Sequence, residues 1–311
     1  MLKRLVRCIF FIPLLTLSQE TISEEIDIFN GDIHIPGTLT YSKSHEKIPL
    51  AIFVHGSGNI DRNGNQQPYI KANYIAQLAD NLTASGIGFY RYDKRTSLPE
   101  NLTRIKNVRI NDFVSDVKLV IDKFKNDIRF SSIHLIGHSQ GSLVAMLSIT
   151  NNVTSYISIA GPSETIDKTI VSQISNQMEE LGKVAQLHIE ELMSNDTIVQ
   201  VNPMLLQVFA PQNQKFLKSW MLINPSEEIK KIEIPILIIA GENDLQVPLL
   251  HAKALKKAKP DASMVTIPEM NHVLKTVKTK DLNQKSYLSP DFALSQELVL
   301  SISEFILNHY E

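Results

Sequence analysis

The sequence has almost no cysteine. Its single cysteine, Cys8, lies within the first twenty residues. One thiol cannot form an intrachain disulfide, and it cannot supply the several ligands that a cysteine-based metal site needs. The remainder of the chain contains no cysteine nucleophile, so its chemistry must use other residue types.

The chain also lacks an excess of charge of either sign. Its 31 basic and 33 acidic residues leave a formal net charge of −2. This balance gives no overall attraction to a phosphate backbone, and we therefore expect no nucleic-acid partner. A hydrophobic content of 43% with 21% charged residues is typical of a soluble globular protein. A chain of 311 residues then folds as one large domain or as a core that carries an insert.

Long apolar runs are missing as well. Near the N-terminus, Lys3, Arg4 and Arg7 precede the apolar run at residues 8–15, which small polar residues follow. This pattern predicts a signal peptide within residues 1–20, and hence a periplasmic or secreted protein. The run is too short to span a bilayer comfortably, so we expect no stable membrane span in the mature protein; an uncleaved anchor or a buried N-terminal helix is the alternative.

From residue 26 onward, strand-like and helix-like segments alternate. This order predicts an α/β fold with a mainly parallel sheet covered by helices on both faces. A turn at Asn30-Gly31 predicts an antiparallel hairpin at the edge of the sheet. The expected strands are residues 26–29, 32–41, 48–54, 87–92, 132–136, 153–160, 234–240 and 264–267, and the expected helices are residues 73–85, 110–125, 142–149 and 292–308.

The alternation stops between residues 162 and 225. Two apolar-periodic stretches, about 165–194 and 203–222, have no strand between them. We interpret this segment as a helical lid inserted into a core made of residues 21–161 and 226–311. Its apolar residues should pack on the core or line a ligand pocket; they are Leu205, Leu206, Val208, Phe209, Phe216, Leu217, Trp220 and Met221.

The motif G-x-S-x-G at residues 137–141 indicates a nucleophile. It lies between an apolar run and a helical stretch, where flanking glycines allow the sharp turn that projects the Ser139 hydroxyl. The backbone N–H of Gln140, at the start of the helix, is placed to stabilise an oxyanion. His138 should point away from the Ser139 Oγ and serve packing.

A serine hydroxyl needs a base, and the chain order typical of this arrangement is serine, acid, histidine. Among the downstream histidines, His272 alone follows the last predicted strand in a loop, whereas His188 falls in the lid, His251 begins a helix and His309 ends one. The orienting acid is expected directly after the strand 234–240. Asp244 is our choice, with Glu242 as the substitute.

Two further loops follow earlier strands. The glycine-rich loop at residues 55–58 is placed to give the second oxyanion donor, the backbone N–H of Ser57. Charged residues Asp93, Lys94 and Arg95 follow the next strand. We expect a buried Asp93–Arg95 network there rather than a direct catalytic role.

No cofactor or metal is predicted. His134 and His138 have H-x-x-x-H spacing, but they fall on a predicted strand and its turn, and that spacing brings two ligands to one face only in a helix. The sequence contains neither a phosphate-binding loop nor a dinucleotide fingerprint.

Together these segments resemble the α/β-hydrolase superfamily, and more narrowly its bacterial acyl hydrolases and serine-aminopeptidase-like hydrolases. The resemblance is carried by residues 55–58 with 61–65, 91–95, 137–141, 241–248 and 270–272. It implies an α/β-hydrolase fold and acyl transfer, since the dehalogenases and epoxide hydrolases of this fold use an aspartate where this chain has Ser139. One departure is Thr96-Ser97-Leu98, where similar proteins often have Gly-x-Gly.

Several functions fit this resemblance, because the fold hosts many chemistries. Hydrolysis of carboxylic esters through an acyl-enzyme is the leading prediction, with a thioesterase or a small-peptide peptidase as alternatives. A peptidase would be favoured if Glu179-Glu180 and Glu190-Glu191 formed an acidic cluster that holds a free amino terminus. The alternative outside the enzymes is a ligand-binding protein that has the same fold but no catalytic activity.

Overall fold

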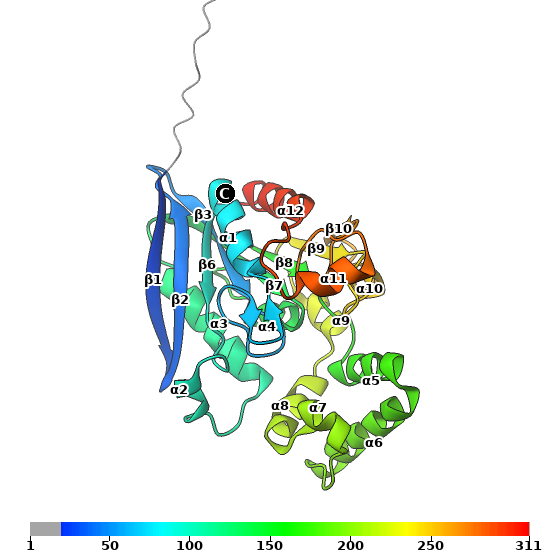
Figure 1. The fold of residues 1–311 in the computed structure, drawn as a ribbon. Coiled ribbons are helices and arrows are strands. Elements are labelled where there is room, and N and C mark those ends of the chain that lie inside the picture. The colour runs from blue at the N-terminus through cyan, green and yellow to red at the C-terminus, as the bar shows by residue number, and fades with distance from the viewer. Residues whose placement is uncertain (1–19, 311) are drawn as a thin grey trace, which may run out of the picture.

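The computed structural model describes residues 20–310, and it has at its centre an eight-stranded sheet (Figure 1). The strand order is β1-β2-β6-β3-β7-β8-β9-β10. The strands are β1 Thr21–Asn30, β2 Ile33–Ser42, β3 Ile48–Val54, β6 Gly88–Tyr92, β7 Phe130–His138, β8 Ser155–Ile159, β9 Ile236–Gly241 and β10 Ser263–Ile267. The signal peptide predicted within residues 1–20 lies outside the described residues, apart from Glu20, and stays a prediction.

The six strands from β6 to β10 run parallel, and side chains on both faces are buried in all of them except β10, the edge strand, which is mostly half-buried. In β9, Ile236 and Ile238 belong to the core on one face, and Leu237 and Ile239 to the core on the other. The first core contains α3 Ile110–Phe124, α4 Gln140–Ser148 and α10 Leu249–Ala258, and the second contains α1 Tyr74–Ala84 and α12 Gln296–Leu307. A strand with two buried faces requires the near-continuous apolar runs seen in the sequence.

The predicted edge hairpin is confirmed. Strand β1 pairs antiparallel with β2, which pairs antiparallel with β6. The turn between the two strands contains Gly31 at φ 60°, a conformation that glycine adopts without strain. A second, two-stranded sheet joins β4 Asn65–Gln66 and β5 Ile70–Lys71.

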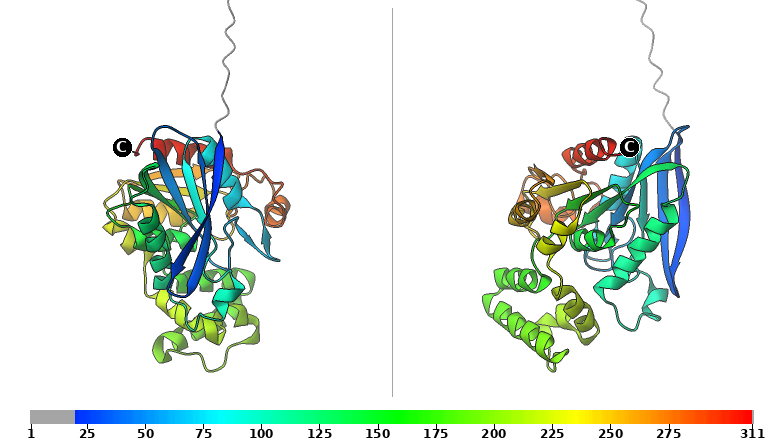
Figure 2. Two further views of the ribbon diagram at one scale, coloured as in Figure 1. Left: turned by 90° about the vertical axis from the view of Figure 1, so that its left-hand side faces the viewer. Right: turned by 180° about the vertical axis from the view of Figure 1, so that it is seen from behind.

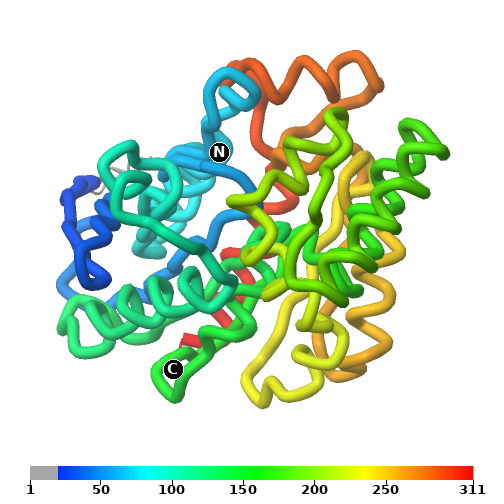
Figure 3. The backbone as a smooth tube through the Cα atoms, turned by 90° about the horizontal axis from the view of Figure 1, so that it is seen from below, coloured from blue at the N-terminus to red at the C-terminus, as the bar shows by residue number. Residues whose placement is uncertain are grey.

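Residues 162–225, the helical insert, contain no strand. Its helices are α5 Ile166–Gln177, α6 Glu179–Asn195, η1 Pro203–Leu205, α7 Leu206–Phe209 and α8 Pro211–Met221, with α9 Pro225–Glu228 and η2 Ile229–Lys231 leading back to β9. Figures 1 and 2 show α5 to α8 gathered below the sheet, and Figure 3 looks at the molecule from that end. Because the insert follows the carboxyl end of β8, it lies at the edge of the sheet where active sites of this architecture form.

The insert contacts the core at a few points. The Phe216 ring of α8 packs edge-on against Phe113 of α3, with ring centroids 5.7 Å apart. The Ser219 hydroxyl of the same helix accepts the Ile110 N–H at 3.0 Å. Most of the apolar residues named above are buried, Phe216 and Val208 are partly buried, and Leu206 is exposed. Packing therefore accounts for most of this apolar surface.

The two ends of the insert are joined to each other. The Ser226 hydroxyl donates to the Ser163 carbonyl at 2.5 Å, and the Ser163 N–H donates to His251 Nδ1 at 3.2 Å. This neck connects the start and the end of the insert to α10.

The remaining helices, α2 Pro99–Leu102 and α11 Lys280–Ser286, are short. Within residues 20–310, none of the helices has the length and apolar character that crossing a membrane requires.

Candidate active site

Ser139 forms the turn between β7 and α4. Its backbone has φ 55° and ψ −123°, a region that residues with a side chain rarely adopt. The flanking glycines explain how so sharp a turn fits, because a Cβ on Gly141 would overlap the carbonyls of Val54 and His55. The strand-turn-helix context predicted for the motif is present, and it holds Ser139 partly exposed among buried neighbours.

Asp244 and His272 form a buried pair. Asp244 follows β9 and His272 follows β10, and His272 Nδ1 lies 2.7 Å from Asp244 Oδ2. The other carboxylate oxygen, Oδ1, accepts the N–H groups of Gln246 at 2.8 Å and Val247 at 2.9 Å. An ionised Asp244 accepts the Nδ1 proton of His272, and Nε2 is the ring nitrogen that this bond leaves free.

Burial alone would raise the pKa of the Asp244 carboxyl. The charge and hydrogen bond of His272, with the two backbone N–H groups, outweigh burial and hold this pKa below its ordinary value. Glu242 is exposed and has no hydrogen bond to His272. The geometry therefore favours Asp244 over Glu242 as the orienting acid.

His138 supports the histidine loop. Its Nε2 donates to the His272 carbonyl at 2.8 Å, and the two rings are 4.8 Å apart. Burial, with a smaller contribution from His272, lowers the pKa of His138 to about 3, so the ring is neutral. His138 thus holds the backbone of His272, in line with the packing role expected from the sequence.

This contact brings the serine turn and the histidine loop together. Between them, however, the described residues form no hydrogen bond from Ser139 Oγ to His272 Nε2. Such bonds are often long without substrate and shorten when substrate binds.

The loop after β3 lies against the nucleophile. A Cβ on Gly56 would lie 3.2 Å from Ser139 Cβ. The next residue, Ser57, is exposed, and its N–H has no acceptor in the part of the chain that the structure describes. Gln140 is the first residue of α4, where backbone N–H groups lack intrahelical acceptors. Both predicted oxyanion donors are therefore on segments that border Ser139.

The predicted Asp93–Arg95 network is wrong in its pairing. Asp93 accepts from Arg62, with Arg62 Nη2 2.8 Å from Asp93 Oδ2, and Arg95 binds Asp116 of α3 at 2.6 Å. In each pair the arginine donates two N–H groups to the carboxylate of a residue on another element. Residues two apart in the chain need not face each other, and the sequence did not show Arg62 or Asp116 as partners.

Lys94, between these two residues, has a contact that sequence reasoning missed. Its Nζ donates to the Gly56 carbonyl at 2.7 Å and to Gln140 Oε1 at 2.9 Å. The available signal was a lysine directly after a buried strand, at the sheet edge that also carries residues 55–58 and 137–141.

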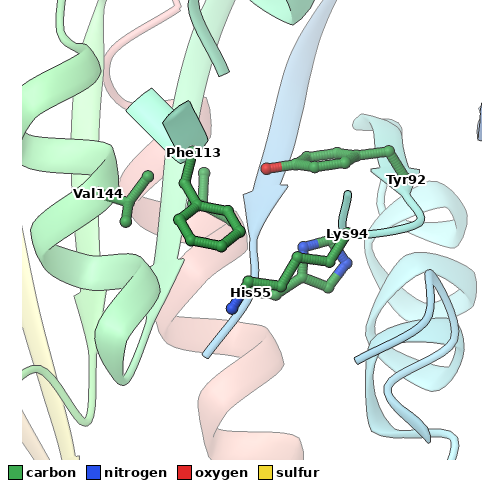
Figure 4. A pocket seen from close by; sticks show the side chains of 6 residues that line it. His55, Tyr92, Lys94, Phe113 and Val144 are labelled. Atoms are coloured by element: carbon green, nitrogen blue, oxygen red, sulfur yellow. The ribbon is translucent and has the colours of Figure 1, made fainter. Parts of the chain in front are cut away.

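A small cavity of about 10 Å³ lies behind these loops (Figure 4). This is on the order of the space for one water molecule and is too small for an acyl chain. Its lining residues are Val54, His55, Tyr92, Lys94, Phe113 and Val144.

His134, which the sequence singled out for its H-x-x-x-H spacing, has ordinary hydrogen-bond partners. His134 lies between the hydroxyls of Ser132 and Ser155, at 2.9 and 2.7 Å. Within the described residues, no cluster of three potential metal ligands occurs.

The four glutamates of α6, in the insert, do not form an acidic cluster at the site. Glu179 and Glu180 are exposed and pair with Lys183. Glu190 accepts from Gln186, and Glu191 accepts the Val199 N–H. These contacts lie on the surface of the insert itself.

Comparison with solved structures shows the same fold. Est1E from Butyrivibrio proteoclasticus is 18% identical, with a TM-score of 0.58 over 92% of this chain and 98% of that one. An esterase from Pyrococcus furiosus, Pf2001, is 17% identical, with a TM-score of 0.60 over 98% of this chain and 97% of that one. The acylaminoacyl peptidase of Pyrococcus horikoshii is 14% identical, with a TM-score of 0.60 over 94% of this chain and 42% of that one.

The search of curated protein sequences gave no match. The BD-FAE family model, in contrast, matches residues 32–258, which contain β2 to β9, the Ser139 turn and Asp244. The fold and the five sequence motifs both indicate an α/β-hydrolase, in agreement with this match. The chain therefore belongs to the BD-FAE family of α/β-hydrolases.

Proposed function

We propose that this protein is a serine hydrolase that cleaves carboxylic esters or related acyl compounds through an acyl-enzyme. The observation that carries the proposal is the buried Asp244–His272 pair, with Nδ1 and Oδ2 2.7 Å apart, next to the strained turn of Ser139. An observed backbone outlier at a turn of this kind is a reason to infer function.

In the proposed mechanism, His272 Nε2 takes the proton of the Ser139 hydroxyl as the oxygen attacks the substrate carbonyl. The tetrahedral oxyanion accepts the N–H groups of Ser57 and Gln140, while Asp244 stabilises the imidazolium. His272 then gives its proton to the leaving alcohol. A water molecule, activated by the same histidine, releases the acid and restores Ser139.

The choice of an ester substrate is supported by two observations. Structural neighbours include esterases, and one Est1E structure contains bound ferulic acid. The acidic residues that would favour a peptidase are solvated on the insert and paired with neighbours there. Thioesters follow the same chemistry and are the second substrate class.

We also propose that the helical insert, residues 162–225, is a lid. It lies at the carboxyl edge of the sheet, and Gln173 of α5 donates to the Gln246 carbonyl at 3.0 Å. Gln246 in turn donates its backbone N–H to Asp244. Movement of α5 would therefore displace the loop that contains Asp244 and Gln246.

A fluorophosphonate probe, which reacts with activated serines, tests the mechanism. Wild-type protein should be labelled stoichiometrically, and both Ser139→Ala and His272→Ala should abolish labelling and ester turnover. Ser131→Ala is the matched control, because Ser131 is exposed on the same strand as the turn but far from its carboxyl end. Labelling that survives in folded Ser139→Ala would refute the proposal, and absence of labelling in folded wild type would favour a binding protein.

A further inference from the structure

Lys94 is a buried amine that has no carboxylate partner. Only 5% of the residue is exposed, and among the described residues it takes part in no ion pair. Its surroundings are the Phe113 ring, whose centroid is 4.6 Å from Nζ, and the other residues that line the cavity in Figure 4, which are Val54, His55, Tyr92 and Val144. Burial of an unpaired amine is unfavourable, so its presence here requires a reason other than stability.

The two acceptors of Lys94 belong to the two segments that carry the proposed oxyanion donors. One is the Gly56 carbonyl, on the loop of Ser57, and the other is the side chain of Gln140. The lysine thus cross-links the loop after β3 to the first residue of α4. No other side chain in the described chain donates hydrogen bonds to both segments.

The first of these bonds acts through the peptide plane. The Gly56 carbonyl and the Ser57 N–H belong to one peptide unit, which is planar and, in the trans form, directs the two groups in opposite directions. A bond that holds the carbonyl oxygen toward Lys94 therefore fixes the direction of the Ser57 N–H away from Lys94. Stabilisation of an oxyanion requires an N–H donor that already points at the oxyanion position and does not have to rotate during the reaction.

We propose that Lys94 is a positioning residue of the oxyanion hole, which holds the Ser57 and Gln140 N–H groups in the arrangement that a tetrahedral intermediate needs. This inference rests on the proposed serine mechanism. Lys94 does not touch the substrate in this role, and it acts through the peptide of Gly56 and the side chain of Gln140. Burial lowers the pKa of Lys94 to about 7, but the neutral amine retains two N–H donors and so can keep both bonds.

The test uses Lys94→Met, which keeps the length of the side chain and removes both hydrogen bonds. Substrates are 4-nitrophenyl acetate and its thiono analogue, in which sulfur, a weaker acceptor, replaces the carbonyl oxygen. Loss of one oxyanion donor typically lowers kcat by about 10²- to 10³-fold, so loss of its positioning should lower kcat on the oxoester by roughly 10- to 100-fold with KM little changed. The thionoester rate should fall much less, and the oxo-to-thiono ratio should fall about tenfold.

Lys275→Met is the matched control. Lys275 is a second buried lysine, and its Nζ also donates to a backbone carbonyl, that of Phe292, and to a glutamine side chain, that of Gln77. Its loss should lower Tm, as the loss of any buried hydrogen-bonded lysine does, while the oxo-to-thiono ratio stays at the wild-type value. If Lys94→Met does not fold, Gln140→Met removes one of the two acceptors without touching the Gln140 N–H and should still lower the ratio several-fold.

An unchanged ratio in the folded Lys94 or Gln140 variant, or an equal loss on both substrates, would overturn the positioning role. Ser139→Ala is measured in the same series to separate the two proposals. Full turnover in Ser139→Ala would refute the serine mechanism, whereas its inactivity beside a wild-type-like Lys94→Met would refute only the inference about Lys94.

Discussion

The strained backbone of Ser139 makes a prediction about stability as well as activity. Glycine adopts positive φ readily, whereas alanine at φ 55° keeps the strain of the native serine. Both Ser139→Gly and Ser139→Ala should be inactive, and we expect Ser139→Gly to be more stable than Ser139→Ala by about 1 kcal/mol. Urea unfolding of the two variants measures the difference, and an alanine variant at least as stable as the glycine variant would show that this turn stores no strain.

A second prediction concerns the loop after β9 and distinguishes the roles of its two carboxylates, Glu242 and Asp244. Asp244→Asn keeps the shape of the side chain but loses the charge that stabilises the imidazolium, and it should lower kcat by about 10⁴-fold. Glu242→Gln, two residues earlier and exposed, should change kcat by less than about threefold. Steady-state kinetics on one ester compares them, and the reverse order of effects would move the orienting role to Glu242.

Within the site, local motifs were more predictable from the sequence than the contacts around them. The G-x-S-x-G turn, the loop after β9 and the loop after β10 each follow a strand directly, and so their places at the sheet edge follow from pattern alone. The Arg62–Asp93 and Arg95–Asp116 pairs and the bonds of Lys94 depend on how separate elements pack. No local signal contains that information.

Strand β7 and the loop after β3 contain buried, neutral histidines. From these histidines we predict how the free energy of unfolding changes as the pH falls. Burial lowers the pKa values of His55, His134 and His138 to about 3 each, from an ordinary 6.5. Between pH 6.5 and 3 the unfolded chain binds more protons than the folded one at these positions, so stability is lost as the pH falls through this window. Each group contributes a slope of at most about 1.4 kcal/mol per pH unit.

Urea unfolding at pH 7, 6 and 5 tests this expectation, because these values lie above the range in which carboxylates titrate. We expect His134→Gln to lower the slope, since His134 is bonded only to Ser132 and Ser155 and lies away from the site. His45→Gln is the control, because this histidine is exposed in the loop after β2. Equal slopes in wild type and His134→Gln would contradict the assignment of neutral, buried His134.

Element boundaries show where sequence patterns lose information. The first strand begins at Thr21 instead of residue 26, because an edge strand is half exposed and its polar residues give a weak signal. The last helix begins at Gln296 instead of residue 292, since the Ser295 hydroxyl accepts the Leu298 N–H and caps the helix there. Central strands, buried on both faces, were predicted to within about two residues at most ends.

The molecule as a whole separates a catalytic core from the helical insert. If the insert is a lid that sets substrate choice, exchange of residues 162–225 for the corresponding segment of a related hydrolase should shift the preferred acyl-chain length. Fluorophosphonate labelling of Ser139 should persist in the chimera, because the serine turn and the two loops of the acid and base belong to the core. A folded chimera with an unchanged profile across C2 to C12 esters would show that specificity lies in the core.

The neck between Ser163 and Ser226 has a consequence for how such proteins diversify. The chain leaves the core and returns to it at two points that a single hydrogen bond joins, from the Ser226 hydroxyl to the Ser163 carbonyl. Segments whose ends meet can be lengthened, shortened or replaced during evolution without a change in the distance that the core must bridge. If the insert sets substrate choice, as we propose, the substrate preference and the reaction can change independently during evolution.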